Sequence, residues 1–276
     1  MRLEYTRKSP KGLDWQSRAR LTELLRRTTG TVTPEQAAKI LELPPIKAAK
    51  ILSRWAAQGW LARVRRGLYV PVPLTAQSGD VALEDPWIVA ESLFSPCYIG
   101  GWSAAEHWGL TEQIFRTVCV LTVRRPRERS LVLRGTEFQL RTVSSQALFG
   151  LKPVWRGRVR VNVSDPARTV VDMLAEPALG GGLRSMEDVL RAWLGSSEFR
   201  DLKLLVEYAG RLDNGAVFKR LGYLLERYAP GEIEAIKACR ARLSAGNAKL
   251  DPALPSKRLI SAWRLWVPAG REKRST

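Results

Sequence analysis

The sequence predicts an α+β protein with two parts of unequal size. Residues 15–58 carry closely spaced helix-start and helix-stop signals, and residues 60–70 contain two extended runs around a glycine. After residue 85, segments with helical periodicity mix with runs of alternating apolar residues. Three short helices followed by a β-hairpin make a winged helix-turn-helix, so we expect that module first and a larger mixed α/β domain behind it.

The first two helices are predicted from their capping residues. Asp14 can cap a helix from Trp15 to about Thr28, and Gly30 ends it. Its apolar residues fall on one face: Leu21, Leu24 and Leu25. Thr33 and Gln36 can form a capping box for a second helix over 34–41, whose first residue is a proline.

The third helix has one apolar side and one basic side. The Pro44-Pro45 pair forces a corner, after which we expect a helix over 45–58 that ends at Gly59. At 100° per residue the basic residues fall together, about a third of a turn from the apolar ones. The apolar residues are Ala48, Ile51, Leu52 and Trp55, and the basic residues are Lys47, Lys50 and Arg54.

The hairpin that follows is predicted to carry arginines at its tip. Two extended runs, 60–64 and 68–70, flank a turn in which Gly67 can adopt a positive φ. No Asp or Glu occurs between Leu43 and Gly79. We therefore predict DNA binding, with Lys47, Lys50 and Arg54 in the major groove and Arg63, Arg65 and Arg66 on phosphates or in the minor groove. The alternative is a small helical domain with a solvated charged face.

Composition narrows the class of protein. The 276 residues carry a net charge of +18, and 45% of them are hydrophobic, which favours a globular protein with a polyanionic partner. No apolar run approaches the roughly 18 residues of a membrane span, and the N-terminus lacks the apolar segment of a signal peptide. Three distant cysteines and one histidine suggest neither disulfides nor a zinc site, so we expect a cytoplasmic protein without a metal or cofactor.

A stretch rich in proline and small polar residues, 71–80, is the expected boundary between a domain of residues 1–80 and one of 81–276. Residues 1–13 and 271–276 are expected to be loose ends. In the second domain we predict helices over 85–93, 104–108 (capped by Ser103), 165–174, 186–194, 202–211, 216–228 and 232–241. Strands are predicted over 118–123, 138–143 and 159–163, and an extended segment within 250–268 should return to the same sheet.

A second basic concentration lies in the strand region. It comprises Arg116, Arg124, Arg125, Arg127, Arg129, Arg141, Arg158 and Arg160. Within it, Arg141, Arg158 and Arg160 fall on the phase opposite to the apolar residues of the predicted strands, so we expect a sheet with one arginine-rich face.

No residue is predicted to be catalytic. His107 reads as a packed residue, and Asp165, Arg168, Thr169 and Asp172 read as a helix cap with an Arg–Asp pair. The Gly195-Ser196 pair is typical of nucleotidyltransferases, but no acidic pair follows it to hold magnesium. The acid-x-Lys element at 201–203, which a metal-dependent nuclease would use, lies in a predicted helix. Trp55 and Trp60 are expected in the module's core rather than stacked on bases.

Several phrases, taken in order, resemble the AbiEi family of antitoxins, the transcriptional-regulator halves of abortive-infection toxin-antitoxin pairs. They span most of residues 15–267 and comprise GWLARVRRGLY (59–69), YIGGWSAAEHWGLT (98–111), DPARTVVDML (165–174), KRLGYLLE (219–226) and Trp263-Arg264-Leu265.

The resemblance implies that the module binds operator DNA, with inverted repeats expected, and represses its own operon. It also implies that the second domain counteracts a nucleotidyltransferase-like toxin as part of a type IV pair, directly or functionally. The second arginine group is then the candidate surface for antitoxicity. Two alternatives remain open: a stand-alone regulator whose second domain dimerises or senses a ligand, and a nuclease guided by the winged helix.

Overall fold

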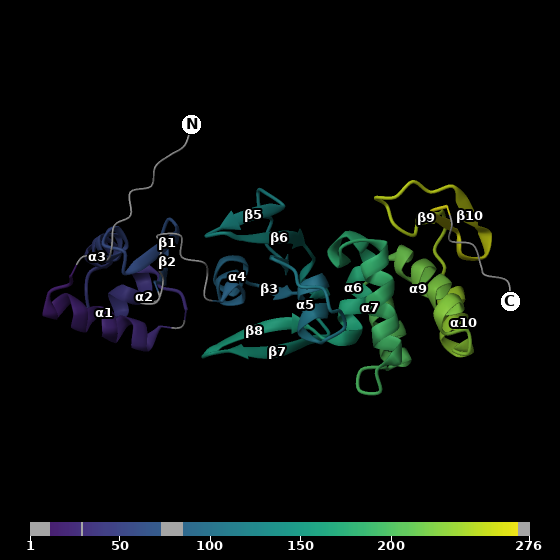
Figure 1. Cartoon of the computed structure of the whole chain (residues 1–276), viewed down its shortest axis with the longest axis horizontal. Helices are drawn as coiled ribbons and strands as arrows, with labels where there is room; N and C mark the ends of the chain where they lie inside the picture. The colour runs from purple at the N-terminus through teal and green to yellow at the C-terminus, as the bar shows by residue number, and fades with distance from the viewer. Residues whose placement is uncertain (1–11, 29, 73–84, 270–276) are drawn as a thin grey trace.

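The computed structural model describes residues 12–28, 30–72 and 85–269 of the chain. The protein is elongated: the N-terminal module lies at one end, a twisted sheet in the middle and a group of helices at the other end (Figure 1). The described part mixes helices with three sheets of two, three and six strands, so the predicted α+β class is confirmed. The expected domain boundary and the two loose ends lie largely outside the described residues.

The N-terminal module has the predicted order of elements, and its caps form as the residue types require. Asp14 accepts a 2.8 Å hydrogen bond from the backbone N–H of Ser17, and Thr33 with Gln36 makes the capping box. Gly59, which follows the third helix, has a φ of +84°, and Gly67, in the turn of the hairpin, has a φ of +77°. The elements are α1 Trp15–Arg27, α2 Pro34–Ile40, α3 Pro45–Ala57, β1 Leu61–Arg65 and β2 Leu68–Pro71.

The module has its own small core. Leu24, Ala48, Leu52 and Trp55 are each 0% exposed, and Trp60 is half-buried against them. Both tryptophans therefore pack in the core, as the sequence predicted.

The middle of the molecule is a six-stranded sheet of order β5-β6-β4-β3-β8-β7. Its two edges are antiparallel hairpins, and the inner strands pair in parallel where β4 meets β6 and where β3 meets β8. The strands are β3 Cys97–Ile99, β4 Thr117–Thr122, β5 Ser130–Leu133, β6 Thr136–Thr142, β7 Leu151–Arg156 and β8 Val159–Ser164. Strands β3, β5 and β7 of this sheet were not predicted. Strands β3 and β5 have only three and four residues, and Pro153 interrupts the pattern of β7, which an edge strand tolerates.

One face of this sheet is covered by α4 (Pro86–Phe94) and by the rear of the β1–β2 hairpin. A single apolar cluster joins Leu68 and Val70 of the hairpin to Trp87 of α4 and to Val120 and Phe138 of the sheet. The module therefore shares a core with the domain behind it.

The other face carries α5, which begins at Gly101 and ends at His107. The prediction that Ser103 caps this helix was wrong. Ser103 is buried, and its hydroxyl accepts a 2.9 Å hydrogen bond from the N–H of Cys119 on β4. Gly101 has a φ of +53°, and a Cβ there would lie 2.3 Å from the carbonyl oxygen of Leu179, so only glycine fits at this start.

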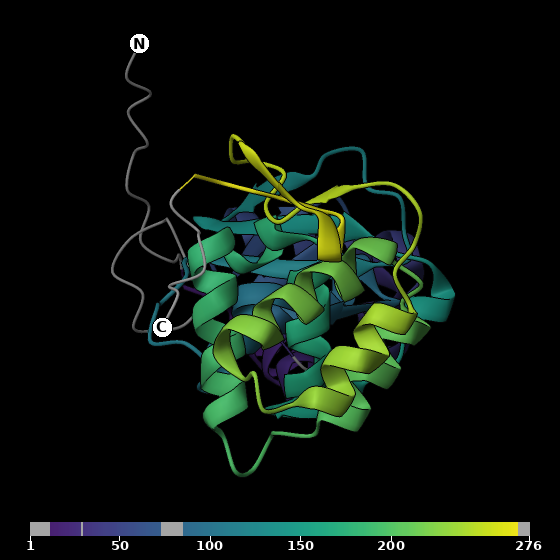
Figure 2. The same ribbon diagram turned by 90° about the vertical axis from the view of Figure 1, so that its right-hand side faces the viewer.

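The C-terminal helices pack around a second large core that contains Trp193, Leu221 and Trp263. Viewed along the long axis, they lie in front of the sheet, with the last strands above them (Figure 2). The helices are α6 Pro166–Ala175, α7 Leu183–Gly195, α8 Leu202–Arg211, α9 Gly215–Tyr228 and α10 Ile233–Ala241. None of the helices among the described residues is long and apolar enough to cross a membrane.

The last segment does not return to the six-stranded sheet, contrary to the prediction. It forms a separate sheet of order β10-β11-β9, with β9 Ala248–Lys249, β10 Arg258–Ile260 and β11 Leu265–Val267. The reason is a close contact with α9: Trp263 is fully buried against Gly222, where a Cβ would lie 2.0 Å from the indole ring. The indole N–H donates to Glu226 at 2.7 Å, which fixes the segment over that helix.

Candidate nucleic-acid interface

Helix α3 presents its basic side chains to solvent. Lys47, Lys50 and Arg54 are exposed, while Leu52 and Trp55 on the opposite side are 0% exposed. At 3.6 residues per turn the three cations span about 60° of the helix surface. This arrangement suits a helix that enters the major groove, although the DNA contacts themselves stay a prediction.

The start of α3 favours anionic groups as well. Its N-cap residue, Pro44, makes no side-chain hydrogen bond to the first turn. No N-cap side chain satisfies the N–H groups of that turn, and the positive end of the helix dipole there adds to the charge of Lys47. A phosphate near this point would receive both interactions.

The wing is basic at its tip and anchored at its base. Arg63, Arg65 and Arg66 are exposed. The carbonyl oxygen of Arg63 accepts a 2.9 Å hydrogen bond from the guanidinium of Arg134, which lies in the β5–β6 turn with a φ of +49°. The structure thus adds Arg134 beside the predicted set, a residue that local sequence patterns could not place there.

The opposite edge of the sheet also reaches the module. Arg158, at the tip of the β7–β8 hairpin, donates a 3.2 Å hydrogen bond to the carbonyl oxygen of Arg26 at the end of α1. The hydroxyls of Thr31 and Ser92 lie 2.9 Å apart between the module and α4. Both edge hairpins and α4 therefore hold the module, which fixes how α3 lies relative to the sheet.

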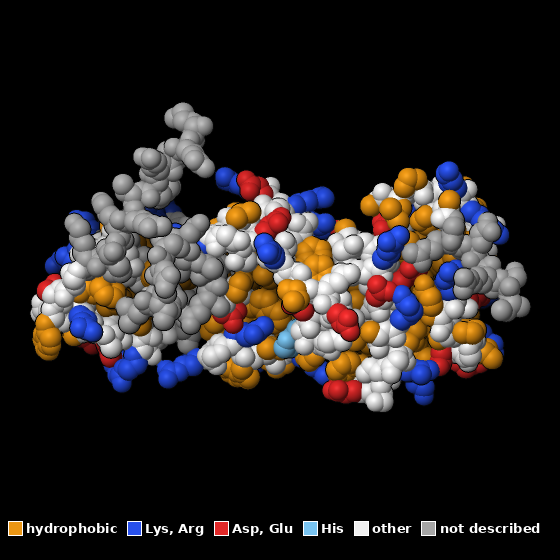
Figure 3. Space-filling model, in the orientation of Figure 1, with side chains coloured by type: hydrophobic (Ala, Val, Ile, Leu, Met, Phe, Trp, Pro, Cys, Tyr) orange, Lys and Arg blue, Asp and Glu red, His pale blue; other side chains and the backbone are white. Residues whose placement is uncertain are grey.

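The second arginine group is divided between the two edges of the sheet. Arg141 on β6 and Arg160 on β8 do alternate with the buried residues of their strands, as predicted. Arg124, Arg125, Arg127 and Arg129 lie in the loop between β4 and β5, and Arg116 directly precedes β4. Arg158 and Arg160 belong to the β7–β8 hairpin at the other edge, because β4 and β3 separate β6 from β8. On the face seen in Figure 3, Lys and Arg side chains are spread along the whole molecule.

Arg141 has a structural contact of its own. Its guanidinium forms an ion pair with Glu176, and its side chain is only 17% exposed. Because this side chain is largely buried and paired, we expect it to act by joining β6 to the residue after α6 rather than by contacting a partner.

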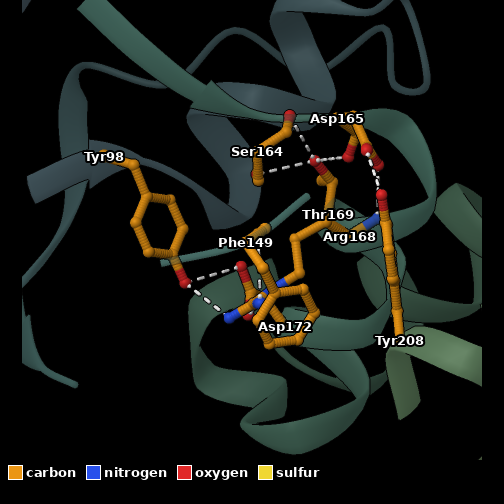
Figure 4. A network of polar contacts seen from close by, with 8 residues as sticks. All are labelled: Tyr98, Phe149, Ser164, Asp165, Arg168, Thr169, Asp172 and Tyr208. Atoms are coloured by element: carbon orange, nitrogen blue, oxygen red, sulfur yellow. Dashed lines mark hydrogen bonds and ion pairs between the residues drawn. The ribbon is translucent and has the colours of Figure 1, made fainter. Parts of the chain in front are cut away.

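The polar residues of α6 form a buried network with Tyr98 (Figure 4). Arg168 is 0% exposed; its Nε lies 2.9 Å from Asp172, and it donates to the Tyr98 hydroxyl at 3.0 Å. That hydroxyl donates to the second oxygen of Asp172 at 3.1 Å. Asp165 caps α6 and accepts a 3.0 Å hydrogen bond from Tyr208. The predicted cap and Arg–Asp pair are therefore confirmed.

Burial dominates the electrostatics of this network. It raises the pKa of Asp172, against the opposing effect of the Arg168 guanidinium, and it raises the pKa of Tyr98 well above its usual value. Tyr98, Arg168 and Asp172 are buried, and their polar side-chain atoms have partners. The network therefore joins α6 and β3, and through the partly exposed Tyr208 also α8, rather than offering a reactive group.

His107 lies against two aromatic rings but is exposed, so it is less buried than predicted. Its ring centroid lies 5.4 Å from that of Trp87 and 4.6 Å from that of Trp108, both edge-on. Partial burial lowers the pKa of His107, and Arg156 lowers it further. Over residues 12–28, 30–72 and 85–269, no group of three His, Cys, Asp or Glu side chains could hold a metal ion.

Residues 19–72 match the sequence model of a family described as the AbiEi antitoxin family of transcriptional regulators. The match covers α2, α3 and the wing with most of α1, and it confirms the resemblance for the module. No curated protein matches the chain. The crystal structure of the RV2827C protein from Mycobacterium tuberculosis is similar in fold, with a TM-score of 0.62 and 18% identity, over 95% of this chain and 93% of that one.

Proposed function

We propose that the chain is the antitoxin and autoregulator of a type IV toxin-antitoxin pair, acting in the cytoplasm. In this proposal, residues 1–80 bind operator DNA with inverted repeats and repress the operon. Residues 81–276 counteract a nucleotidyltransferase-like toxin, directly or functionally. The observation that carries the DNA-binding half is the exposed basic side of α3 beside an arginine-tipped wing, within the segment that matches AbiEi regulators.

The expected DNA contacts divide by position. Lys47 and Lys50, in the first half of α3, read base edges, and Arg54 adds to the same face. Arg63, Arg65 and Arg66 bind phosphates or the minor groove. Because phosphate contacts release counterions, affinity should fall with salt with a log–log slope of about −0.9 per neutralised phosphate.

Replacing Lys50 with alanine is expected to weaken operator binding by about 5- to 150-fold, since a base contact in the major groove contributes roughly 1–3 kcal/mol. The measurement is a titration of promoter duplex with the full chain at several salt concentrations. Lys203→Ala is the matched control, because Lys203 is also exposed but lies on α8. Equal losses in both variants would mean that net charge alone, rather than α3, determines binding.

The antitoxin half is supported by the arginines of the β4–β5 loop. Arg125, Arg127 and Arg129 are exposed and form no ion pair within the described ranges. Cations that the fold does not use are available to a partner, although solvation alone can also account for them.

Reversing the charges of Arg125, Arg127 and Arg129 to glutamate is expected to abolish rescue of cells that express the neighbouring toxin gene, with operator binding retained. Growth with and without the variant is the readout. The control is the triple reversal of Arg184, Lys203 and Lys257, three exposed cations of the C-terminal region. Full rescue by the first variant would remove this loop from the proposal. A neighbouring gene without toxicity would favour a stand-alone regulator.

A further inference from the structure

Ile46 is a large apolar side chain on the solvent face of α3. It is 73% exposed, lies in the first turn and belongs to none of the apolar clusters of the described residues. At 100° per residue it lies about 40° from Lys50 and on the opposite side of the helix from Trp55. The other exposed residues of α3 that follow it are Lys47, Lys50, Ser53, Arg54 and the small Ala57.

This placement has a consequence if α3 enters the major groove, so the inference rests on the proposed function. The first residues of a recognition helix come closest to the base edges. Those edges present hydrogen-bond donors and acceptors, which an isoleucine cannot satisfy, and one apolar group, the 5-methyl of thymine. A branched aliphatic side chain at that place removes water from the polar base edges without replacing their hydrogen bonds, which is unfavourable. Contact with the thymine methyl group avoids this loss.

We propose that Ile46 reads a thymine of the operator through its 5-methyl group. The position of that thymine follows from the helix. Ile46 and Lys50 are one turn apart on the same side, about 6 Å along the axis, and base pairs are spaced about 3.4 Å apart. Lysine contacts guanine O6 and N7 most often, so the thymine lies within about two base pairs of the guanine that Lys50 contacts.

The test uses the full chain and a modified base. The chain first selects its sites from a random duplex library, and each thymine of the selected site is then replaced by deoxyuridine, which removes the methyl group and keeps the pairing. Affinities are measured for the unaltered chain, for Ile46→Ala and for Val132→Ala. Val132, on β5, is a matched control because it is a similarly exposed aliphatic residue, 64% against 73%.

One thymine in each half-site is expected to matter. Its replacement by deoxyuridine should weaken binding by the unaltered chain about fourfold, which is the effect of burying one methyl group. Ile46→Ala should bind both duplexes equally, and Val132→Ala should keep the fourfold difference. Because Ile46 is exposed, its variant is expected to keep the melting temperature of the unaltered chain, which separates a lost contact from a lost fold.

Two results would overturn the proposal, and only one of them would also overturn the proposed DNA binding by α3. In the first result, the chain selects duplexes, but replacing thymine by deoxyuridine weakens binding by the unaltered chain and by Ile46→Ala to the same extent. Ile46 then reads no thymine, and DNA binding by α3 stands. If the chain selects no duplex sequence at all, both this inference and the proposed function are overturned.

Discussion

Replacement of Asp172 by alanine is expected to lower the free energy of unfolding by about 3–5 kcal/mol, as for other broken buried ion pairs. Arg168 would keep its charge at 0% exposure, because a guanidinium cannot lose its proton at any usual pH. The measurement is urea unfolding followed by circular dichroism. The matched control is Asp188→Ala on α7, whose ion pair with Arg191 is about half exposed and should contribute about 0.5 kcal/mol or less.

The opposite change, Arg168→Met, is expected to cost less, because Asp172 can become neutral by binding a proton. Without Arg168, the main effect that lowers the Asp172 pKa is lost, so burial raises that pKa further, opposed only by the hydrogen bond from Tyr98. The folded variant then binds a proton that the unfolded chain, with a carboxyl pKa of about 3.9, releases. Stability should therefore decrease as pH rises from about 4 to the raised pKa of Asp172. Equal costs for both single variants, or a pH-independent Arg168→Met, would contradict this account.

Replacement of Trp55 by alanine is expected to cost about 3–5 kcal/mol and to abolish operator binding together with the fold of the module. Trp55 is 0% exposed and packs against Leu24 and Leu52. Thermal unfolding and DNA titration on the same sample test the link. Trp15→Ala is the control, because Trp15 is 84% exposed on α1 and should change stability little.

Trp55→Phe refines the same test. The indole N–H of Trp55 is buried and has no hydrogen-bond partner among the described residues, so phenylalanine removes volume but no bond. Its cost should therefore be well below that of alanine. Loss of DNA binding by Trp55→Ala with unchanged unfolding would mean instead that the indole itself contacts DNA.

Many of the helices were predictable because their boundaries are set by local chemistry. Helix α7 was an exception: it begins at Leu183, three residues before the predicted start, and no side chain caps it. Four capping side chains each accept a hydrogen bond from the backbone N–H three residues on, which requires only the residue type and its neighbours: Asp14, Thr33, Asp165 and Asp201. Helix α8 accordingly begins and ends where the sequence predicted it. The same reasoning failed for α5, where Gly101 starts the helix and Ser103 bonds to the sheet instead.

The features that the sequence did not reveal depend on contacts between distant residues. Strand β3 has too few residues for a pattern, and only its pairing with β4 and β8 defines it. The contacts of Arg134 with Arg63 and of Arg158 with Arg26 join residues 71 and 132 positions apart. The basic residues of α3 could be placed on one side of that helix from its periodicity alone. The division of the second arginine group between two edges of the sheet follows only from the strand order.

The shared core behind the wing limits how such a protein can evolve a new operator. Ala62, Leu68 and Val70 pack with Trp87 of α4, so a recombination event between residues 72 and 85 would join two halves of a core from different parents. Grafting a foreign module would leave mismatched cavities there unless α4 and the sheet changed as well. New operator specificity is therefore expected to arise through point substitutions on the outer side of α3, where Ile46, Lys47 and Lys50 touch nothing that the fold requires.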